Sequence, residues 1–246
     1  MQELIAQLAR LYLPAGPVPD GLAGHLGGGA ARTFDLTREG RVRALVIGFD
    51  RQDGDAEGAH WQRLCDVANA LQAELALPAP AVSISGEQGF RLWLSFEQMV
   101  PVAVMQRFAD LLQGACLADL PAPGSISAPV AFLPCLNPAT GKWAAFIHPG
   151  MGASFAEEAG LEVAPPAAAQ AAFLEPLQSI GTDKLEHALA RLQGSPRAVE
   201  STPASAPQIA DASPGLLLKD ATLEDIVRHL HSKNIEPTFR HLLPPR

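Results

Sequence analysis

The chain contains little cysteine and no long hydrophobic run, and these scarcities exclude several classes of protein. Its three cysteines, Cys65, Cys116 and Cys135, lie far apart among 246 residues, and no two have the CxxC spacing. A disulfide framework and a cysteine zinc site are therefore excluded, and a reducing, cytoplasmic location is expected. No run of about 18 apolar residues occurs, so no membrane span is predicted. The amphipathic N-terminus carries charged residues, unlike a signal peptide.

Positive charge and aromatic side chains are also scarce. Lys and Arg number 18 against 26 Asp and Glu, which gives a formal net charge of -8, and aromatic residues make up 6% of the chain. Binding nucleic acid through a large electrostatic interface needs a basic surface, so the composition argues against that mode of binding. It does not exclude a small basic site. With 48% hydrophobic residues, the chain can bury a core and form one or two domains.

Composition and hydrophobic periodicity divide the chain into four parts. They are an N-terminal helix with a Gly/Pro-rich loop (1–31), an α+β domain (32–193), a flexible linker (194–214) and a C-terminal helical tail (215–246). The loop is expected to be mobile, and the linker is rich in Pro, Ala and Ser with little to bury. The tail carries one amphipathic helix, too little for a core of its own, so it is expected to dock on the main domain or on a partner protein.

The main domain has alternating strand and helix signals. Strands are predicted over 42–49, 81–85, 90–96, 130–136 and 143–147, and helices over 58–76, 101–115, 155–160, 167–180 and 183–193, after an N-terminal helix over 2–13. The order βαββαβ with one extra strand predicts a ferredoxin-like or RRM-like fold, an antiparallel sheet with two helices on one face. The first strand is mostly apolar and should be buried on both faces, whereas residues 90–96 alternate and should be half-buried.

The first candidate site is a group of carboxylates, Asp50, Asp53 and Asp55, at the end of the first strand. Carboxylates gathered at a strand end can hold Mg²⁺ or Mn²⁺, because these hard cations prefer oxygen ligands. Ligands on one strand face would fall at i and i+2, but Gln52 stands two residues after Asp50. The alternative is a solvated acidic loop whose Asp and Gly residues make turns.

The second candidate is the predicted hairpin turn Ser85-Gly86-Glu87-Gln88-Gly89, which Arg91 follows. Gly86 and Gly89 permit backbone N–H groups to converge on an anion, and a guanidinium at Arg91 can bind phosphate with two hydrogen bonds. A tight hairpin with an outward-facing arginine is the alternative.

The third candidate is the segment LPCLNPATGKWAAFIH, over 133–148, in which Lys142 and His148 could face a ligand. Alternatively Lys142 is solvated and His148 ends a strand. His60 is expected at the surface, at the start of a helix. No cysteine has the sequence context of a nucleophile.

Together these three places resemble the archaeo-eukaryotic primase-polymerase superfamily, particularly members carried by plasmids and other mobile genetic elements. The family's motifs are similar to VIGFD (46–50), SGEQGFRLW (85–93) and the segment 133–148, in the same order over about residues 42–148. The resemblance implies an RRM-like core that acts in DNA replication. It also implies a divalent metal held by Asp50, with Asp53 or Asp55, and nucleotide phosphates bound by the second motif, at Ser85, Gly86, Gly89 and position 91.

Three departures from the family pattern fall on its catalytic positions. Gln52 replaces the second Asp of the first motif, Arg91 replaces the histidine of the second, and His148 stands where an acid would end the third. Loss of a carboxylate removes charge that a two-metal site needs. The sequence therefore predicts a degenerate active site that binds a nucleotide or nucleic acid end through Arg91 and Lys142 and polymerises poorly or not at all.

Two other functions fit the sequence. One is a non-enzymatic interaction protein, in which the ferredoxin-like domain is a scaffold and the tail 215–246 presents its helix to a partner protein. The other is an RNA-binding domain of the RRM type. The second is disfavoured because Trp93 is the one strand aromatic suited to base stacking.

Overall fold

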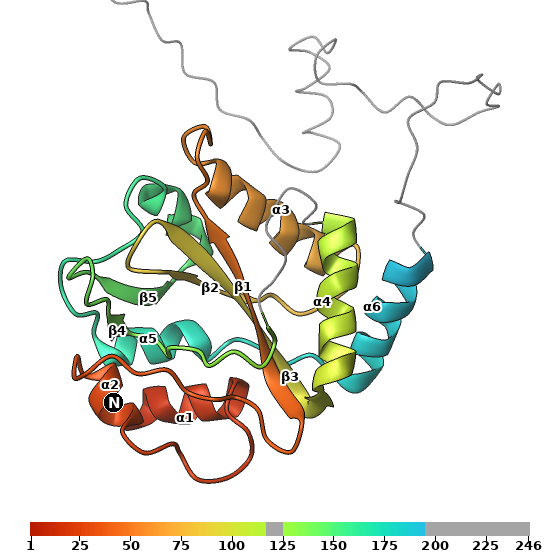
Figure 1. Ribbon diagram of the computed structural model, residues 1–246, viewed down its shortest axis with the longest axis horizontal. Coiled ribbons are helices and arrows are strands. Elements are labelled where there is room, and N and C mark those ends of the chain that lie inside the picture. Colours follow the sequence, from red (N-terminus) through yellow and green to blue (C-terminus); the bar gives the residue numbers. More distant parts are fainter. Residues whose placement is uncertain (117–124, 195–246) are drawn as a thin grey trace, which may run out of the picture. The chain divides into compact units, whose positions relative to one another are not determined.

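A computed structural model describes residues 1–116 and 125–194 (Figure 1). The helices are α1 (Gln2–Leu11), α2 (Leu22–Leu26), α3 (Ala59–Ala73), α4 (Val102–Cys116), α5 (Ala167–Leu174) and α6 (Thr182–Gly194), with a 3-10 helix, η1, at Pro149–Phe155. The strands are β1 (Arg41–Asp50), β2 (Ala81–Ile84), β3 (Gly89–Pro101), β4 (Cys135–Leu136) and β5 (Trp143–Ile147). Apart from Gly194, the predicted linker and the predicted tail lie outside the described residues.

The strands form one five-stranded sheet in the order β1-β3-β2-β5-β4, with every neighbouring pair antiparallel. Because β3 lies between β1 and β2, these two strands run parallel and α3 connects them, as the predicted first half of the fold requires. The α+β class is confirmed. The ferredoxin-like arrangement is not, because β5 pairs with β2 instead of lying beside β1.

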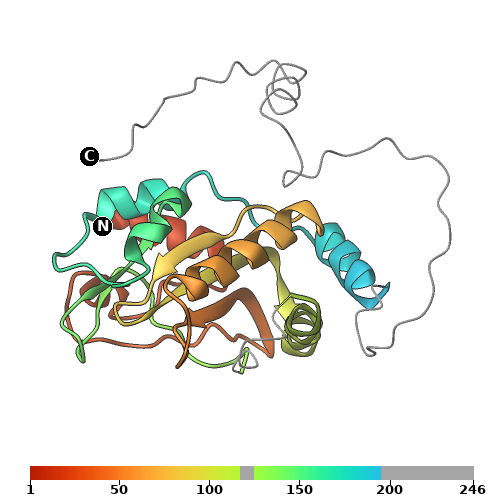
Figure 2. The same ribbon diagram turned by 90° about the horizontal axis from the view of Figure 1, so that it is seen from above.

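Helices cover both faces of the sheet, so the prediction of helices on a single face is wrong (Figure 2). On one face α3, α4 and α6 bury the apolar side chains of β1 and β3. On the other face α1 and α5 pack over the small and aromatic residues of β3 and β5. This second layer comes largely from the N-terminal segment, whose Tyr12 ring lies 5.3 Å from that of Trp93.

The second layer also changes the burial of β3. Trp93 is 2% exposed and Ser95 is 6% exposed, so the alternating strand is buried on both faces and the half-buried prediction is wrong. The alternation of residue types along β3 therefore reflects two different helix layers, one on each face, and not one helix layer and one solvated face. Because Trp93 is buried, it is not an exposed platform for RNA bases, and the RRM-type alternative loses its one candidate.

Three predicted elements differ locally. The strand expected over 130–136 is reduced to β4, because Pro134 interrupts it. The helix expected over 155–160 is absent, since η1 ends at Phe155. The loop over 14–31 contains α2, whose Leu22, His25 and Leu26 side chains are buried.

His60 is buried against Phe90 instead of lying at the surface, so that expectation is also wrong. It is 1% exposed, its ring lies 5.2 Å from that of Phe90, and its Nδ1 has no hydrogen-bond partner in the described part of the chain. Burial, assisted by the positive charge of Arg63, lowers the pKa of His60 below its ordinary value.

Acidification is therefore expected to destabilise the fold through His60. Because the pKa of His60 is lower in the folded than in the unfolded chain, the unfolded chain binds more protons as the pH falls below about 6.5, and the free energy of unfolding decreases. Urea unfolding between about pH 7 and pH 5 should show a shallower decrease for His60→Leu than for the unmodified chain. Equal slopes would contradict this assignment.

Candidate functional site

Asp50 and Arg91, predicted as site residues from separate motifs, are in direct contact. Asp50 ends β1 opposite Gly89, and Arg91 lies two residues further along β3 on the same sheet face. The Arg91 guanidinium donates through Nη1 to Asp50 Oδ1 at 2.6 Å and to the Phe90 carbonyl at 2.9 Å. The antiparallel register of β1 and β3 thus brings these two motifs together.

Glycines on both strands leave room for this ion pair. A Cβ atom on Gly89 would lie 2.2 Å from Asp50 Oδ1, and one on Gly48 would lie 3.4 Å from Arg91 Nη1. The Asp50 carboxylate therefore lies over Gly89, and the Arg91 guanidinium lies over Gly48. Side chains at these two positions would push the pair apart or out of the sheet face.

The turn between β2 and β3 is held by hydrogen bonds within the protein. Ser85 Oγ accepts from the N–H groups of Glu87 at 3.2 Å and Gly89 at 3.1 Å. Gly86 has a φ of +75° and donates its N–H to the Ala159 carbonyl at 2.7 Å. These three N–H groups are engaged, so the geometry assigns Ser85, Gly86 and Gly89 a structural role, and their contact with a nucleotide stays a prediction.

A cavity of about 410 Å³ opens on the sheet face beside Arg91. This sheet cavity is lined by strand residues that include Gly48, Ser83, Ser85, Arg91 and Trp93, and by several residues between 125 and 137. Arg91 and Glu87 are the charged residues among the described residues of its lining. Its volume is within the usual range for small-molecule sites, and one cation amid polar and apolar walls can orient an anionic ligand.

A second, acidic hollow of about 480 Å³ lies on the other side of the ion pair. Its charged lining residues are Asp50, Arg51, Glu87, Lys142, Glu157 and Glu158, four carboxylates against two cations. The Lys142 ammonium contacts Glu158 and lies 3.5 Å from the Glu162 carboxylate. Lys142 and Asp50 therefore line the same hollow, but the charge of Lys142 is already compensated by these carboxylates.

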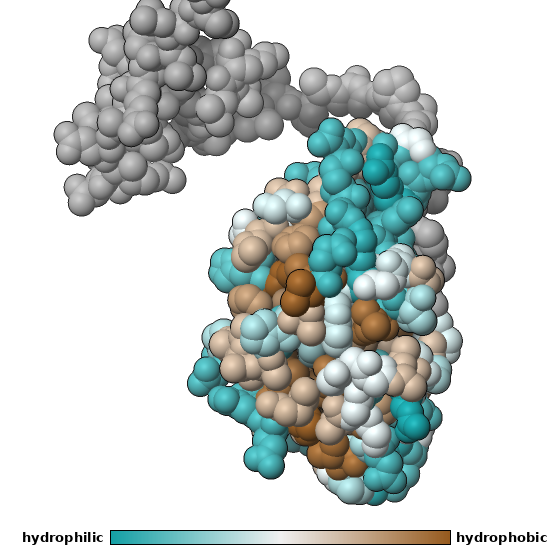
Figure 3. Space-filling model, turned by 90° about the vertical axis from the view of Figure 1, so that its left-hand side faces the viewer, coloured by the Kyte–Doolittle hydropathy of each residue, from teal (hydrophilic) through white to brown (hydrophobic). Residues whose placement is uncertain are grey.

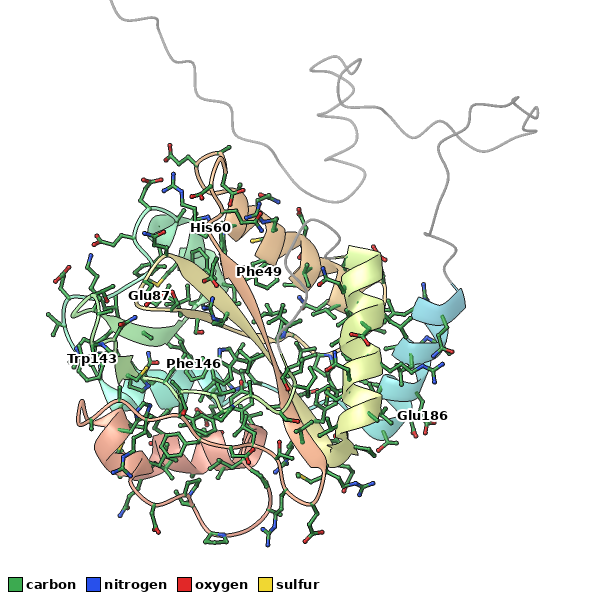
Figure 4. The ribbon with its side chains drawn as sticks, in the orientation of Figure 1. Phe49, His60, Glu87, Trp143, Phe146 and Glu186 are labelled. Carbon is green, nitrogen blue, oxygen red and sulfur yellow. The ribbon has the colours of Figure 1, made fainter. Side chains whose placement is uncertain are left out.

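The side of the molecule that carries Glu87 and Trp143 combines polar and apolar surface (Figure 3, Figure 4). Glu87 and Trp143 lie together at its edge, away from Glu186 on α6 (Figure 4). Seen directly, the same side shows hydrophobic patches interspersed with hydrophilic ones (Figure 3).

The predicted metal ligands do not gather around Asp50. Asp55 accepts two hydrogen bonds from Arg63, at 2.8 and 2.5 Å, and one from the Gln52 N–H at 2.8 Å. The hydrogen bonds from Arg63, followed by that from Gln52, hold the pKa of Asp55 well below its usual range. Asp53 is exposed in the same loop.

This arrangement does not suit a divalent cation. Among residues 1–116 and 125–194, no group of three or more His, Cys, Asp or Glu side chains is placed to hold a metal ion. Asp50 is paired with Arg91 and Asp55 with Arg63, so the donors that Mg²⁺ or Mn²⁺ would need are directed to guanidinium groups. The Mg²⁺ or Mn²⁺ site stays a prediction.

His148 has a local structural role, away from the ion pair. Its Nδ1 accepts from the Gly150 N–H at 3.1 Å and caps η1, and His148 lines neither the sheet cavity nor the acidic hollow. Burial raises the pKa of the Cys135 thiol to about 11, which disfavours its thiolate form at neutral pH.

The sequence patterns do not single out Ser83 or residues 125–132 of the cavity wall, whereas residues 133–137 belong to the third candidate segment. Ser83 faces Arg91 across the β2–β3 pair, and its Oγ accepts from Trp93 Nε1 at 2.9 Å. Counting back from the turn closed by Ser85 and Gly89 would have placed Ser83 opposite Arg91. Residues 125–132 give no comparable signal, because they form turns and a single isolated bridge and not a helix or strand.

Comparisons with known proteins show a distant structural likeness. No protein-family model matches the chain, and no curated protein matches it. Among solved structures, it is similar to the AEP domain of the cyanophage S-2L primase-polymerase, with a TM-score of 0.38 and 13% identity over 70% of this chain and 97% of that chain. A likeness at this level establishes neither family nor function. Within the described ranges, no helix is long and apolar enough to cross a membrane.

Proposed function

We propose that this chain binds a nucleotide or a phosphorylated nucleic acid end in the sheet cavity, as a primase-polymerase-like protein with a degenerate active site. The observation that carries the proposal is the Asp50–Arg91 contact at the edge of that cavity, where the motifs at 46–50 and 85–93 meet. Arg91 anchors the phosphate, and the mixed polar and apolar walls hold the nucleoside.

Degeneracy is proposed from the same residues. Polymerisation through two metal ions needs several carboxylates at one point. Here Gln52 replaces one carboxylate, Asp55 is bonded to Arg63, and Asp50 is bonded to Arg91. Within residues 1–116 and 125–194, the chain therefore keeps a means of binding phosphate and does not assemble a ligand set for nucleotidyl transfer.

Replacing Arg91 with alanine is expected to weaken nucleotide binding by roughly 10- to 100-fold, the usual range for a lost charge-assisted hydrogen-bonding group. Isothermal titration of adenosine mono-, di- and triphosphate into both proteins measures the change. Arg107→Ala is the matched control, because Arg107 is exposed on α4, which packs against the opposite face of the sheet.

Two results would overturn the proposed function. If none of the three nucleotides releases or absorbs heat on addition to the unmodified chain, no nucleotide site exists. Equal affinities of the Arg91→Ala and Arg107→Ala variants would likewise overturn the proposal. Primer synthesis by the unmodified chain from nucleoside triphosphates with Mg²⁺ or Mn²⁺ would contradict degeneracy while leaving nucleotide binding intact.

A further inference from the structure

We propose that the sheet cavity selects a nucleotide with a single phosphate group, and that this phosphate replaces the Asp50 carboxylate on Arg91. The inference rests on the proposed nucleotide-binding function and adds the ligand class. It is drawn from the distribution of charge on the two sides of the Asp50–Arg91 pair.

The sheet cavity offers one cationic group. Arg91 is the cation of its described lining, and Glu87 is the accompanying carboxylate. One guanidinium matches one phosphate, because its N–H groups pair with two oxygens of the same group. Ser83 and Ser85 also line the strand wall, where their Oγ atoms already accept hydrogen bonds from Trp93 and from the β2–β3 turn.

A longer phosphate chain would meet repulsion. With the nucleoside in the sheet cavity and the first phosphate on Arg91, further phosphates would pass Asp50 toward the acidic hollow. Its four carboxylates outnumber its two cations, and Lys142 already contacts Glu158 and Glu162. Proteins usually offset the charge of a triphosphate with Mg²⁺ held by one or two carboxylates. Here the Asp50 carboxylate is paired with Arg91, and that of Glu158 is paired with Lys142.

Asp50 occupies the place that a phosphate oxygen would take. Its Oδ1 accepts from Arg91 Nη1 at 2.6 Å, so an incoming phosphate must displace it. The Asp50 side chain is 59% exposed, which allows it to rotate into water once Arg91 has a new partner. Asp50 is therefore a built-in competitor for the anion site, and removal of its charge should tighten phosphate binding.

The test compares adenosine mono-, di- and triphosphate by isothermal titration, with and without Mg²⁺, in the unmodified chain, Asp50→Asn and Asp53→Asn. We expect the monophosphate to bind at least about tenfold more tightly than the triphosphate. Asp50→Asn should tighten monophosphate binding by about two- to fivefold, the range for an exposed ion pair. Asp53→Asn is the matched control, since it makes the same charge change in an exposed neighbour without contacting Arg91.

The outcomes separate this inference from the proposed function. Triphosphate binding equal to or tighter than monophosphate binding would overturn the ligand class while supporting a nucleotide site. Weaker monophosphate binding by Asp50→Asn, or equal tightening by Asp53→Asn, would overturn the competitor role. If no nucleotide binds any of the three proteins, the proposed function itself fails. A 5′-phosphorylated dinucleotide, titrated alongside, distinguishes a nucleic acid end from a free mononucleotide as the source of the phosphate.

Discussion

Replacement of Phe90 with alanine is expected to lower the free energy of unfolding by about 3–5 kcal/mol, the usual cost of removing a buried phenyl group. Phe90 is fully buried on β3, where it pairs with Phe49 on β1 and Ile84 on β2. Its ring lies 4.9 Å from that of Trp61 on α3. The cavity left by the substitution would therefore lie between the centre of the sheet and the helix that covers it.

Urea unfolding followed by circular dichroism measures this loss. Phe173→Ala is the matched control, because Phe173 is partly buried at the edge of the other layer and should give a smaller decrease. A decrease no larger than that of the control would show that the α3 layer adapts to fill the cavity. The substitution should also loosen the site, since the Phe90 carbonyl accepts a hydrogen bond from Arg91.

The central elements of the fold could be predicted because their patterns are local. The apolar run of β1, the helical spacing of α3 and the glycine-bounded hairpin of β2 and β3 each express their structure within about 15 residues. The position of β5 beside β2 is non-local. No pattern within β5 states which edge of the sheet it will join, so the fold departs from the predicted arrangement at that point.

The second helical layer was missed for a related reason. The amphipathic pattern of α1 predicted a helix, but an amphipathic face does not identify the surface it will cover. In the structure the apolar face of α1 packs on the sheet face that also carries the sheet cavity, and it buries Leu4, Leu8 and Leu11. The alternation in β3 consequently predicted a solvated face where a second core is present.

The candidate site was predicted in part. Asp50 and Arg91 were singled out from separate motifs, and the sheet register brings them within hydrogen-bonding distance. Their contact with each other was not foreseen, because motif matching treats each residue as pointing toward a ligand. Lys142 and Asp55 were likewise identified as charged candidates without their intramolecular partners, Glu158 and Arg63.

Gln170 illustrates what sequence patterns omit, and it carries the last prediction. It lies in the alanine-rich helix α5, where nothing in the sequence distinguishes it from a surface residue, yet it is 2% exposed. Its Oε1 accepts from the Phe146 N–H at 2.8 Å, and its Nε2 donates to the Phe146 carbonyl at 3.0 Å. β4 pairs with β5 only at Trp143 and Ala144. Beyond these residues, the Gln170 side chain makes the hydrogen bonds to Phe146 that a longer strand would otherwise make.

Gln170→Leu is expected to lower the free energy of unfolding by about 2–6 kcal/mol, since it leaves one buried N–H and one buried carbonyl unpaired at about 1–3 kcal/mol each. Urea unfolding measures the total, and amide hydrogen exchange at Phe146 reports the local loss. Gln178→Leu, at an exposed position after α5, is the control and should change stability little. Equal effects of the two substitutions would mean that water enters to satisfy the Phe146 groups. A large loss confined to Gln170→Leu would instead show that this one side chain stabilises the end of β5. β5 pairs with β2, and Ser83 on β2 lines the sheet cavity.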